Sequence, residues 1–216
     1  MLAAGAQAFD IWGKKEDNRK NKRAGLTARH ATELRQMRVI TGTARGAKLV
    51  TLEGTDVRPT TGRVKEAMFS IIQFEIEGRR VLDLFAGSGQ LGIEALSRGA
   101  RSATFVDQSA KAIDVVKQNL LHTKLAEKAT VLKSDYAACL AGTQAVYDIA
   151  FLDPPYSKGL IDAALPLIAP HMAPNGAVIC EAAAKDSLPQ EPEGFGHLRV
   201  YRYGLTVVGV YRCAER

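Results

Sequence analysis

The sequence predicts an α/β fold in which helices cover both faces of a mostly parallel sheet. The first observation is an alternation of short apolar runs and helical patterns between Arg80 and Cys180, with short connections. The second is a glycine-rich turn directly after the apolar run 81–85, which predicts a buried parallel strand leading into a helix. A length of 216 residues accommodates one such domain with an appendage.

Each element of the alternation has its own apolar pattern. In chain order we expect a strand at 80–85, a helix at 89–98, a strand at 102–106, a helix at 110–122, strands at 130–133 and 147–152, a helix at 158–169 and a strand at 177–180. After Pro189, the strand-like runs 197–203 and 206–212 are separated only by Gly204 and Leu205. This spacing predicts an antiparallel hairpin that closes the sheet.

Two predicted regions precede the catalytic domain, which we expect at 79–216. Residues 1–36 are charged and lack a sustained apolar period, so we expect a tail that is flexible without a partner. Region 37–78 starts with strand-like runs at 38–41 and 48–52, which predict a hairpin with Arg45 at its tip. A helix at 64–77 follows. Its apolar stripe consists of Val64, Met68, Ile71, Ile72 and Phe74.

The net charge of +6 is concentrated near the N-terminus. Residues 1–65 contain fourteen Lys and Arg against six Asp and Glu, and the remaining residues contain fifteen against seventeen. A basic arm on a near-neutral body suits a polyanion, since phosphate contacts supply most non-specific nucleic-acid affinity. A merely solvated tail is the competing interpretation of residues 1–36. For Arg45, a phosphate contact and an exposed turn arginine without a task are both open.

Composition excludes several other classes of protein. Cys139, Cys180 and Cys213 lack metal or redox spacing, which predicts reduced core thiols in a cytosolic protein. No apolar run is long enough to span a bilayer, and residues 1–9 lack the pattern of a secretory signal. The four histidines show no ligand spacing, so we assign no metal. We therefore expect a cytoplasmic protein.

The glycine-rich turn predicts a nucleotide-cofactor site. Gly87, Gly89 and Gly92 match G-x-G-x-x-G, and Asp107 lies about 20 residues further on, where an acid binds ribose hydroxyls. This spacing alone admits NAD, FAD or S-adenosylmethionine. Asp83 favours S-adenosylmethionine, because a carboxylate near the loop repels a pyrophosphate and attracts the ammonium of a methionine end.

Further candidate contacts to the cofactor lie around this turn. Asp135 follows the third strand and is placed either to accept a hydrogen bond from the adenine amine or to cap a helix. Thr60, Thr61 and Arg63 stand at a predicted helix N-terminus, where they either bind an anionic group or, for the threonines, act only as caps. The other candidates flank the acids or the turn and are Phe85, Ala86, Ser88, Gln108 and Tyr136.

Asp153-Pro154-Pro155-Tyr156, hereafter the D-P-P-Y loop, follows a predicted strand and should lie at the carboxyl edge of the sheet, where ligands bind. Its two prolines stiffen the loop, remove two amide donors and leave carbonyls free to accept. These properties fit methyl transfer to an exocyclic amine on an aromatic ring. Asp153 and a loop carbonyl would hold the N–H groups while Tyr156 stacks on the base. A turn without function is the competing interpretation.

Taken together, these motifs resemble class I S-adenosylmethionine-dependent methyltransferases, and within them the RsmD type, which methylates guanine N2 in bacterial 16S ribosomal RNA. The resemblance covers about residues 37–211. It is carried by Arg38-Val39-Ile40-Thr41-Gly42 with Arg45-Gly46, by Arg58-Pro59-Thr60-Thr61 with Arg63, by residues 82–89 with Leu91-Gly92, by residues 94–100, by the D-P-P-Y loop, and by Tyr203-Gly204 with Thr206.

The resemblance implies a Rossmann-like, seven-stranded sheet with an antiparallel last strand, and S-adenosylmethionine as methyl donor. It also implies that Asp153 and Tyr156 face the target base, that Asp107 binds the ribose, that Asp135 lies by the adenine and that segment 58–63 holds the methionine end. Gly62 departs from the family, since relatives often have Asp there, which puts the capping of that helix in doubt. Residues 1–36 have no counterpart in the family.

The implied partner is ribosomal RNA, within a small-subunit assembly intermediate, and we expect a monomer. The basic residues expected to contact the RNA are Arg38, Arg45, Lys48 and Arg58. Two other functions stay open on the sequence alone. One is methylation of adenine N6 in DNA or of a protein glutamine, which uses the same D-P-P-Y loop. The other is a non-enzymatic RNA-binding assembly factor that keeps the fold without turnover.

Overall fold

The computed structural model describes residues 37–52 and 62–214, with the side chain of His197 excepted. The expectations for residues 1–36, for Arg58 and for Thr60 and Thr61 lie outside these residues. The strands are β1 (Arg80–Asp83), β2 (Ser102–Asp107), β3 (Ala129–Lys133), β4 (Tyr147–Leu152), β5 (Met172–Ala183), β6 (Phe195–Tyr203) and β7 (Thr206–Cys213). The helices are α2 (Gly62–Ile71), α3 (Gln90–Ser97), α4 (Ala110–Thr123), α5 (Tyr136–Ala141) and α6 (Leu160–Ile168), with short 3₁₀ turns at Ala126–Lys128 and Ala169–His171.

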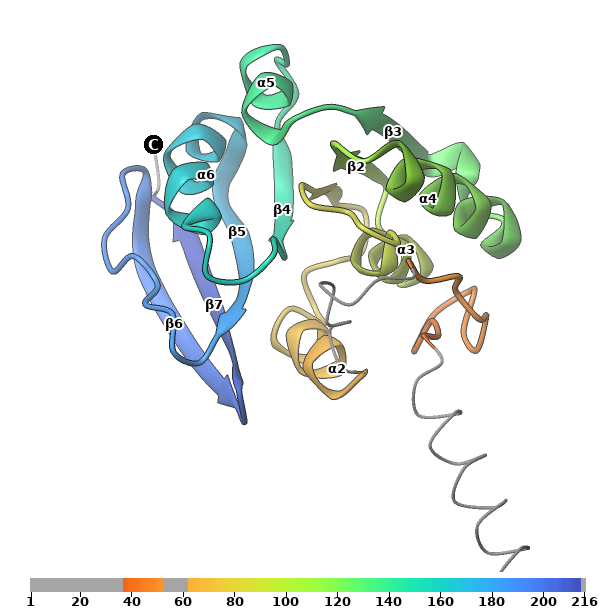
Figure 1. Ribbon diagram of the computed structural model, residues 1–216, viewed down its shortest axis with the longest axis horizontal. Coiled ribbons are helices and arrows are strands. Elements are labelled where there is room, and N and C mark those ends of the chain that lie inside the picture. Colours follow the sequence, from red (N-terminus) through yellow and green to blue (C-terminus); the bar gives the residue numbers. More distant parts are fainter. Residues whose placement is uncertain (1–36, 53–61, 215–216) are drawn as a thin grey trace, which may run out of the picture. The chain divides into compact units, whose positions relative to one another are not determined.

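The strands form one seven-stranded sheet in the order β3-β2-β1-β4-β5-β7-β6 (Figure 1). Strands β1 to β5 pair in parallel, and β7 pairs antiparallel to both β5 and β6. This confirms the predicted sheet with an antiparallel last strand. The strand order reverses between β1 and β4, and ligands of open α/β sheets bind at such a reversal, beyond the carboxyl ends of the strands.

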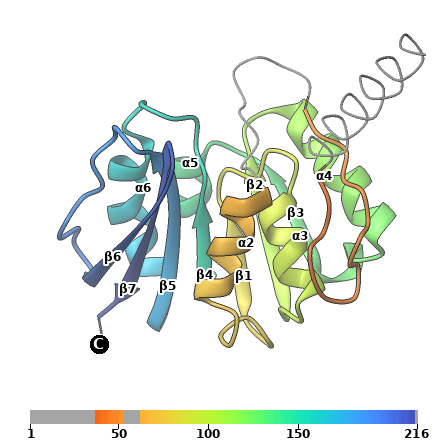
Figure 2. The same cartoon turned by 90° about the horizontal axis from the view of Figure 1, so that it is seen from below.

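Two hydrophobic clusters pack against opposite faces of the sheet. One contains apolar side chains of α2, α3 and α4, and the other contains those of α5 and α6 (Figure 2). Successive residues of β4 divide between them, with Ile149 and Phe151 in the first cluster and Ala150 and Leu152 in the second. This division explains the continuous apolar run of the strand, because a parallel strand covered on both faces buries every side chain.

The expected hairpin at 38–52 is wrong in its detail. A single antiparallel bridge joins Arg38 to Lys48, and no strand forms on either side. Backbone bonds still cross the turn, as from the N–H of Val39 to the carbonyl of Ala47 at 3.0 Å and from the N–H of Leu49 to the carbonyl of Met37 at 2.9 Å. The residues that follow Val39, however, bond to α3. The N–H groups of Ile40 and Thr41 donate to the carboxylate of Glu94 at 2.7 and 3.0 Å.

The helix expected at 64–77 is also shorter than predicted. It ends at Ile71, and the chain turns through residues 72–75, where the N–H of Glu75 donates to the carbonyl of Ile72 at 2.9 Å. Val64, Met68 and Ile72 are buried as the apolar stripe predicts, but Phe74 is 93% exposed. The helical period predicted a buried Phe74 because a repeating pattern alone does not indicate where a helix ends.

Three further differences concern boundaries and thiols. Helix α5 was expected only as the helix that Asp135 would cap, and β5 extends well beyond the expected run at 177–180. Of the cysteines, all of which are free, Cys180 and Cys213 are buried as expected, whereas Cys139 is only partly buried. None of the described helices combines the length and apolar character needed to cross a membrane.

Candidate active site

The turn between β1 and α3 lies beside the acid at the end of β2. Gly87 and Gly89 adopt φ values of 53° and 77°, a region in which side chains other than glycine are strained. The N–H of Gly87 donates to Asp107 Oδ2 at 2.9 Å, and the N–H of Ser109 donates to Asp107 Oδ1 at 2.8 Å. Two backbone amides therefore fix the orientation of the carboxylate that the sequence assigned to a ribose.

The third glycine of the motif allows α3 to approach β2 closely. A Cβ atom on Gly92 would lie 2.3 Å from Phe105 Cε1, far inside van der Waals contact. The N–H of Gly92 also donates to Asp83 Oδ2 at 2.9 Å. Gly92 thus has the helix–strand packing role expected of the last glycine in this motif.

Asp83 lies beneath the turn and is only 1% exposed. Burial raises the pKa of its carboxyl to about 7; the Gly92 hydrogen bond opposes this rise and the charge of Asp107 adds to it. The expectation that Asp83 would lie near the loop agrees with this position. Because the carboxyl is buried, its influence on a bound cation would be electrostatic.

A second set of candidate residues gathers where β1 and β3 end. The rings of Phe85 and Tyr136 lie 5.3 Å apart between centroids. Asp135 caps α5, and its Oδ1 accepts from the N–H groups of Ala137 and Ala138 at 2.9 and 3.3 Å. Asp135 therefore acts as a helix cap, which was one of its two predicted roles. Capping uses one of its two carboxylate oxygens, Oδ1.

Two other turn residues, Ala86 and Ser88, are held through hydrogen bonds to their own backbone groups. The N–H of Ala86 donates to the carbonyl of Val106 at 2.9 Å, and the carbonyl of Ser88 accepts from Asn119 Nδ2 at 2.9 Å. Asn119, on α4, is fully buried and also bonds both backbone groups of Val50. Asn119 was not among the predicted site residues, although it is a polar residue inside an apolar helical stripe. Gln108, next to Asp107, is exposed.

The D-P-P-Y loop follows β4, directly across the strand-order reversal from the glycine turn. The Tyr156 hydroxyl donates to Glu181 of β5. Burial, and then the hydrogen bond to Glu181, raises the pKa of this hydroxyl, so Tyr156 stays protonated at neutral pH. Glu181 was not among the predicted site residues, although it is an acid that directly follows the apolar run 177–180.

A cavity of about 320 Å³ borders this loop. It is lined by residues 154–162 and by Glu181, Ala182 and residues 185–188. Among the described residues, no group of three or more His, Cys, Asp or Glu is arranged to hold a metal ion.

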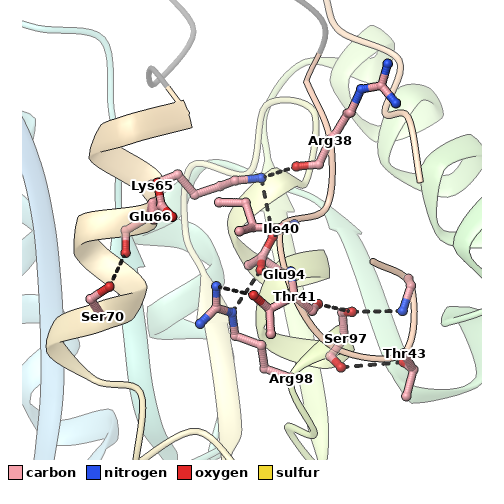
Figure 3. Close-up of polar contacts among 11 residues, drawn as sticks. Arg38, Ile40, Thr41, Thr43, Lys65, Glu66, Ser70, Glu94, Ser97 and Arg98 are labelled. Atoms are coloured by element: carbon pink, nitrogen blue, oxygen red, sulfur yellow. Dashed lines mark hydrogen bonds and ion pairs between the residues drawn. The ribbon is translucent and has the colours of Figure 1, made fainter. Parts of the chain in front are cut away.

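Residues 37–50, here called the strap, lie against α3 (Figure 3). Their anchor is Glu94, which is fully buried and also pairs with Arg98 at 2.8 Å and with Lys65 of α2 at 3.4 Å. Lys65 donates to the carbonyl of Arg38 at 2.7 Å. Glu94 belongs to the motif at 94–100, but no role was predicted for it from the sequence.

The structure brings one group of predicted residues together and leaves another group on the surface. Asp83, Asp107, Asp135 and Asp153 lie at or just beyond the carboxyl ends of β1 to β4, which meet at one edge of the sheet. The basic residues expected to contact RNA are exposed on the strap instead. They are Arg38, Arg45 and Lys48, and Arg63 is likewise exposed in the first turn of α2.

Comparison with known proteins assigns the chain to a family. A family model described as "Conserved hypothetical protein 95" matches residues 37–212. The chain belongs to this family. The resemblance to the RsmD-type methyltransferases is thereby confirmed, and the matched range begins where the described part of the chain begins.

Named proteins from several bacteria are similar to the chain over most of their length. It is 41% identical to a Bacillus subtilis protein named "Putative rRNA methyltransferase YlbH", over 82% of this chain and 98% of that protein. It is 35% identical to Escherichia coli "Ribosomal RNA small subunit methyltransferase D", over 82% and 90%. A solved structure titled "Putative methyltransferase yhhF from Escherichia coli" superposes with a TM-score of 0.75 at 33% identity, covering 84% of this chain and 99% of that one. The class I methyltransferase fold is confirmed.

Proposed function

We propose that this chain transfers a methyl group from S-adenosylmethionine to the exocyclic N2 amine of a guanine in small-subunit ribosomal RNA. The observation that carries the proposal is that one sheet edge holds both the glycine turn with Asp107 and the D-P-P-Y loop. The names of the relatives support ribosomal RNA as the substrate. The proposal places the protein in the cytoplasm, acting as a monomer on an assembly intermediate.

The residues around the glycine turn fit S-adenosylmethionine. Asp107 presents a carboxylate, fixed by two amides, for the ribose hydroxyls. Gln90, in the first turn of α3, is 7% exposed, and its Oε1 has no hydrogen-bond partner among the described residues. A buried acceptor without a donor is costly, and a cofactor ammonium or hydroxyl would satisfy it. When bound, this cofactor supplies an electrophilic methyl group on a positively charged sulfur.

The D-P-P-Y loop would hold the accepting amine. The lone pair of guanine N2 is delocalised into the ring, so the amine is a weak nucleophile and must be aligned with the methyl group. Asp153 and a loop carbonyl would accept its N–H groups, and Tyr156 would stack on the base. A paired base must leave its helix to reach this pocket. After transfer, the amine loses a proton to Asp153 or to water.

The exposed basic residues would contact the RNA backbone. Arg38, Arg45 and Lys48 project from the strap, which α3 holds in place through Glu94. Phosphate contacts of this kind position a nucleic acid without reading its sequence. Arg63 and the segment before it would have a different role, which is to hold the methionine end of S-adenosylmethionine.

The decisive experiment is methyl transfer from labelled S-adenosylmethionine by the wild type and Asp153→Ala. We expect labelled guanine N2 in small-subunit RNA, and a loss of at least about hundredfold in rate for the variant, because the amine loses its acceptor. Calorimetry and thermal unfolding should show that cofactor binding and the fold persist. Asp114→Ala, which removes an exposed acid of α4, is the matched control.

Each alternative function has its own outcome in this assay. Label entering only duplex DNA, or only protein, excludes the guanine-N2 assignment. If no substrate is labelled and Asp153→Ala still supports subunit assembly in cells, the chain is an assembly factor without turnover.

A further inference from the structure

The D-P-P-Y loop is attached to β5 and to the segment after it by two side-chain contacts. The first is the hydrogen bond from the Tyr156 hydroxyl to Glu181. The second is at Ser157, whose N–H and hydroxyl both donate to the carboxylate of Asp186 at 3.0 Å. Both acids come from one chain segment, which starts on β5 beside β4, so this segment holds the loop.

Packing alone does not restrain the Tyr156 ring. Tyr156 belongs to neither hydrophobic cluster of the described residues, and Pro155 and Ser157 on either side of it are exposed. The adjacent cavity of about 320 Å³ gives the ring room to rotate away from the sheet edge. A half-buried ring beside such a space needs a polar contact to keep one orientation.

Glu181 is a rigid point of attachment. It is 2% exposed and lies on β5, which is paired with β4 on one side and with β7 on the other. Its neighbour across the sheet is Val208 of β7. Because Glu181 is held in the sheet, a hydrogen bond to it restricts the movement of the loop.

We propose that Glu181 is a positioning residue for methyl transfer: it holds the Tyr156 hydroxyl so that the ring faces the target base. This inference rests on the function proposed above. Glu181 acts through Tyr156 and needs no contact with substrate or cofactor. Asp186 supports it by fixing Ser157, which has the strained φ of 58°.

A double-mutant cycle between the two residues tests the inference. Glu181→Leu removes the acceptor, and Tyr156→Phe removes the donor while keeping the ring. Each should lower kcat by roughly tenfold to a hundredfold, the range for a hydrogen bond to a charged group, while KM for S-adenosylmethionine stays unchanged. The double variant should be no slower than the slower single variant, because both changes break the same contact.

Two controls separate positioning from general damage. Glu181→Gln keeps an oxygen acceptor of the same length and should stay within about threefold of wild type. Glu191→Leu removes an exposed acid from the connection between β5 and β6 and should leave kcat unchanged. The inference is overturned if the single losses multiply in the double variant, if Glu181→Gln is as slow as Glu181→Leu, or if Glu181→Leu retains the wild-type kcat.

Hydrogen exchange on the protein without substrate tests the contact independently of activity. Amides 156–159 should exchange faster in Glu181→Leu than in wild type, while those of α3 should not change. If the wild type methylates no RNA, the proposed function fails, and the exchange result still decides whether Glu181 restrains the loop. Unchanged exchange in Glu181→Leu would overturn the inference even in an active enzyme.

Discussion

At the scale of single residues, the buried carboxyl of Asp83 lowers the stability of the folded protein. This carboxyl is buried beneath the glycine turn, and one backbone N–H, from Gly92, donates to it at 2.9 Å. Burial raises the pKa of this carboxyl to about 7, from about 3.9 in an unfolded chain. The folded protein therefore holds a proton that the unfolded chain releases, so Asp83 lowers stability increasingly as the pH rises from about 4 to about 7.

Asp83→Asn should remove this pH dependence. Relative to wild type, the free energy of unfolding of the variant should increase by up to about 4 kcal/mol between pH 4 and pH 8, because the neutral amide has no proton to lose. Urea unfolding of both proteins at several pH values measures the difference. A difference that does not vary with pH would mean that Asp83 titrates normally in the folded protein.

At the scale of elements, a buried charge cluster joins the strap, α2 and α3. Glu94 accepts from two strap amides and pairs with Lys65, which is 1% exposed. Burial lowers the pKa of the Lys65 ammonium, and the charge of Glu94 opposes this effect. Since the three elements share this carboxylate, its loss should loosen all of them.

Glu94→Gln should lower the free energy of unfolding by about 3–5 kcal/mol, because Lys65 is left buried without its counter-charge. Adding Lys65→Met should restore part of the loss. The control is Glu75→Gln, whose pair with Arg212 is more than a third exposed on both sides and should cost less than about 1 kcal/mol. Equal losses in the two single variants, measured by thermal or urea unfolding, would contradict a special role for Glu94.

At the scale of the whole molecule, the exposed basic residues and the proposed catalytic residues occupy different elements. The basic side chains of Arg45 and Lys48 are exposed on the strap, whereas the acids lie at the sheet edge. This separation suits a substrate that is held by its phosphates and modified on a base.

Arg45→Ala combined with Lys48→Ala should weaken binding of small-subunit RNA without changing affinity for S-adenosylmethionine. Each lost phosphate contact should reduce the salt dependence of binding by about one unit of slope. Filter binding at several salt concentrations measures both effects. Arg199→Ala, which removes an exposed arginine from the edge strand β6, is the control. If the strap variants and this control bind RNA equally well, the strap does not contact the RNA.

Local patterns were sufficient for most of the fold. The order of strands and helices from Arg80 onward follows from periodicity and from the glycine turn. The same patterns gave wrong boundaries where contacts with other parts of the chain decide how far an element extends. Helix α2 stops before Phe74, and pairing within the strap does not extend to Ile40 and Thr41 because their N–H groups donate to Glu94 of α3.

By itself, the sequence determined most of the elements from Arg80 onward and which acids stand at their ends, because helix and strand periods and turn chemistry act over a few residues. Only the tertiary structure decided how these groups are paired. Tyr156 meets Glu181 across 25 residues, and Glu94 meets the strap across more than 50. Many acids were available to each donor, and no local rule selects among partners so distant along the chain. Packing of the elements made that selection, because it alone determines which side chains lie within hydrogen-bonding distance.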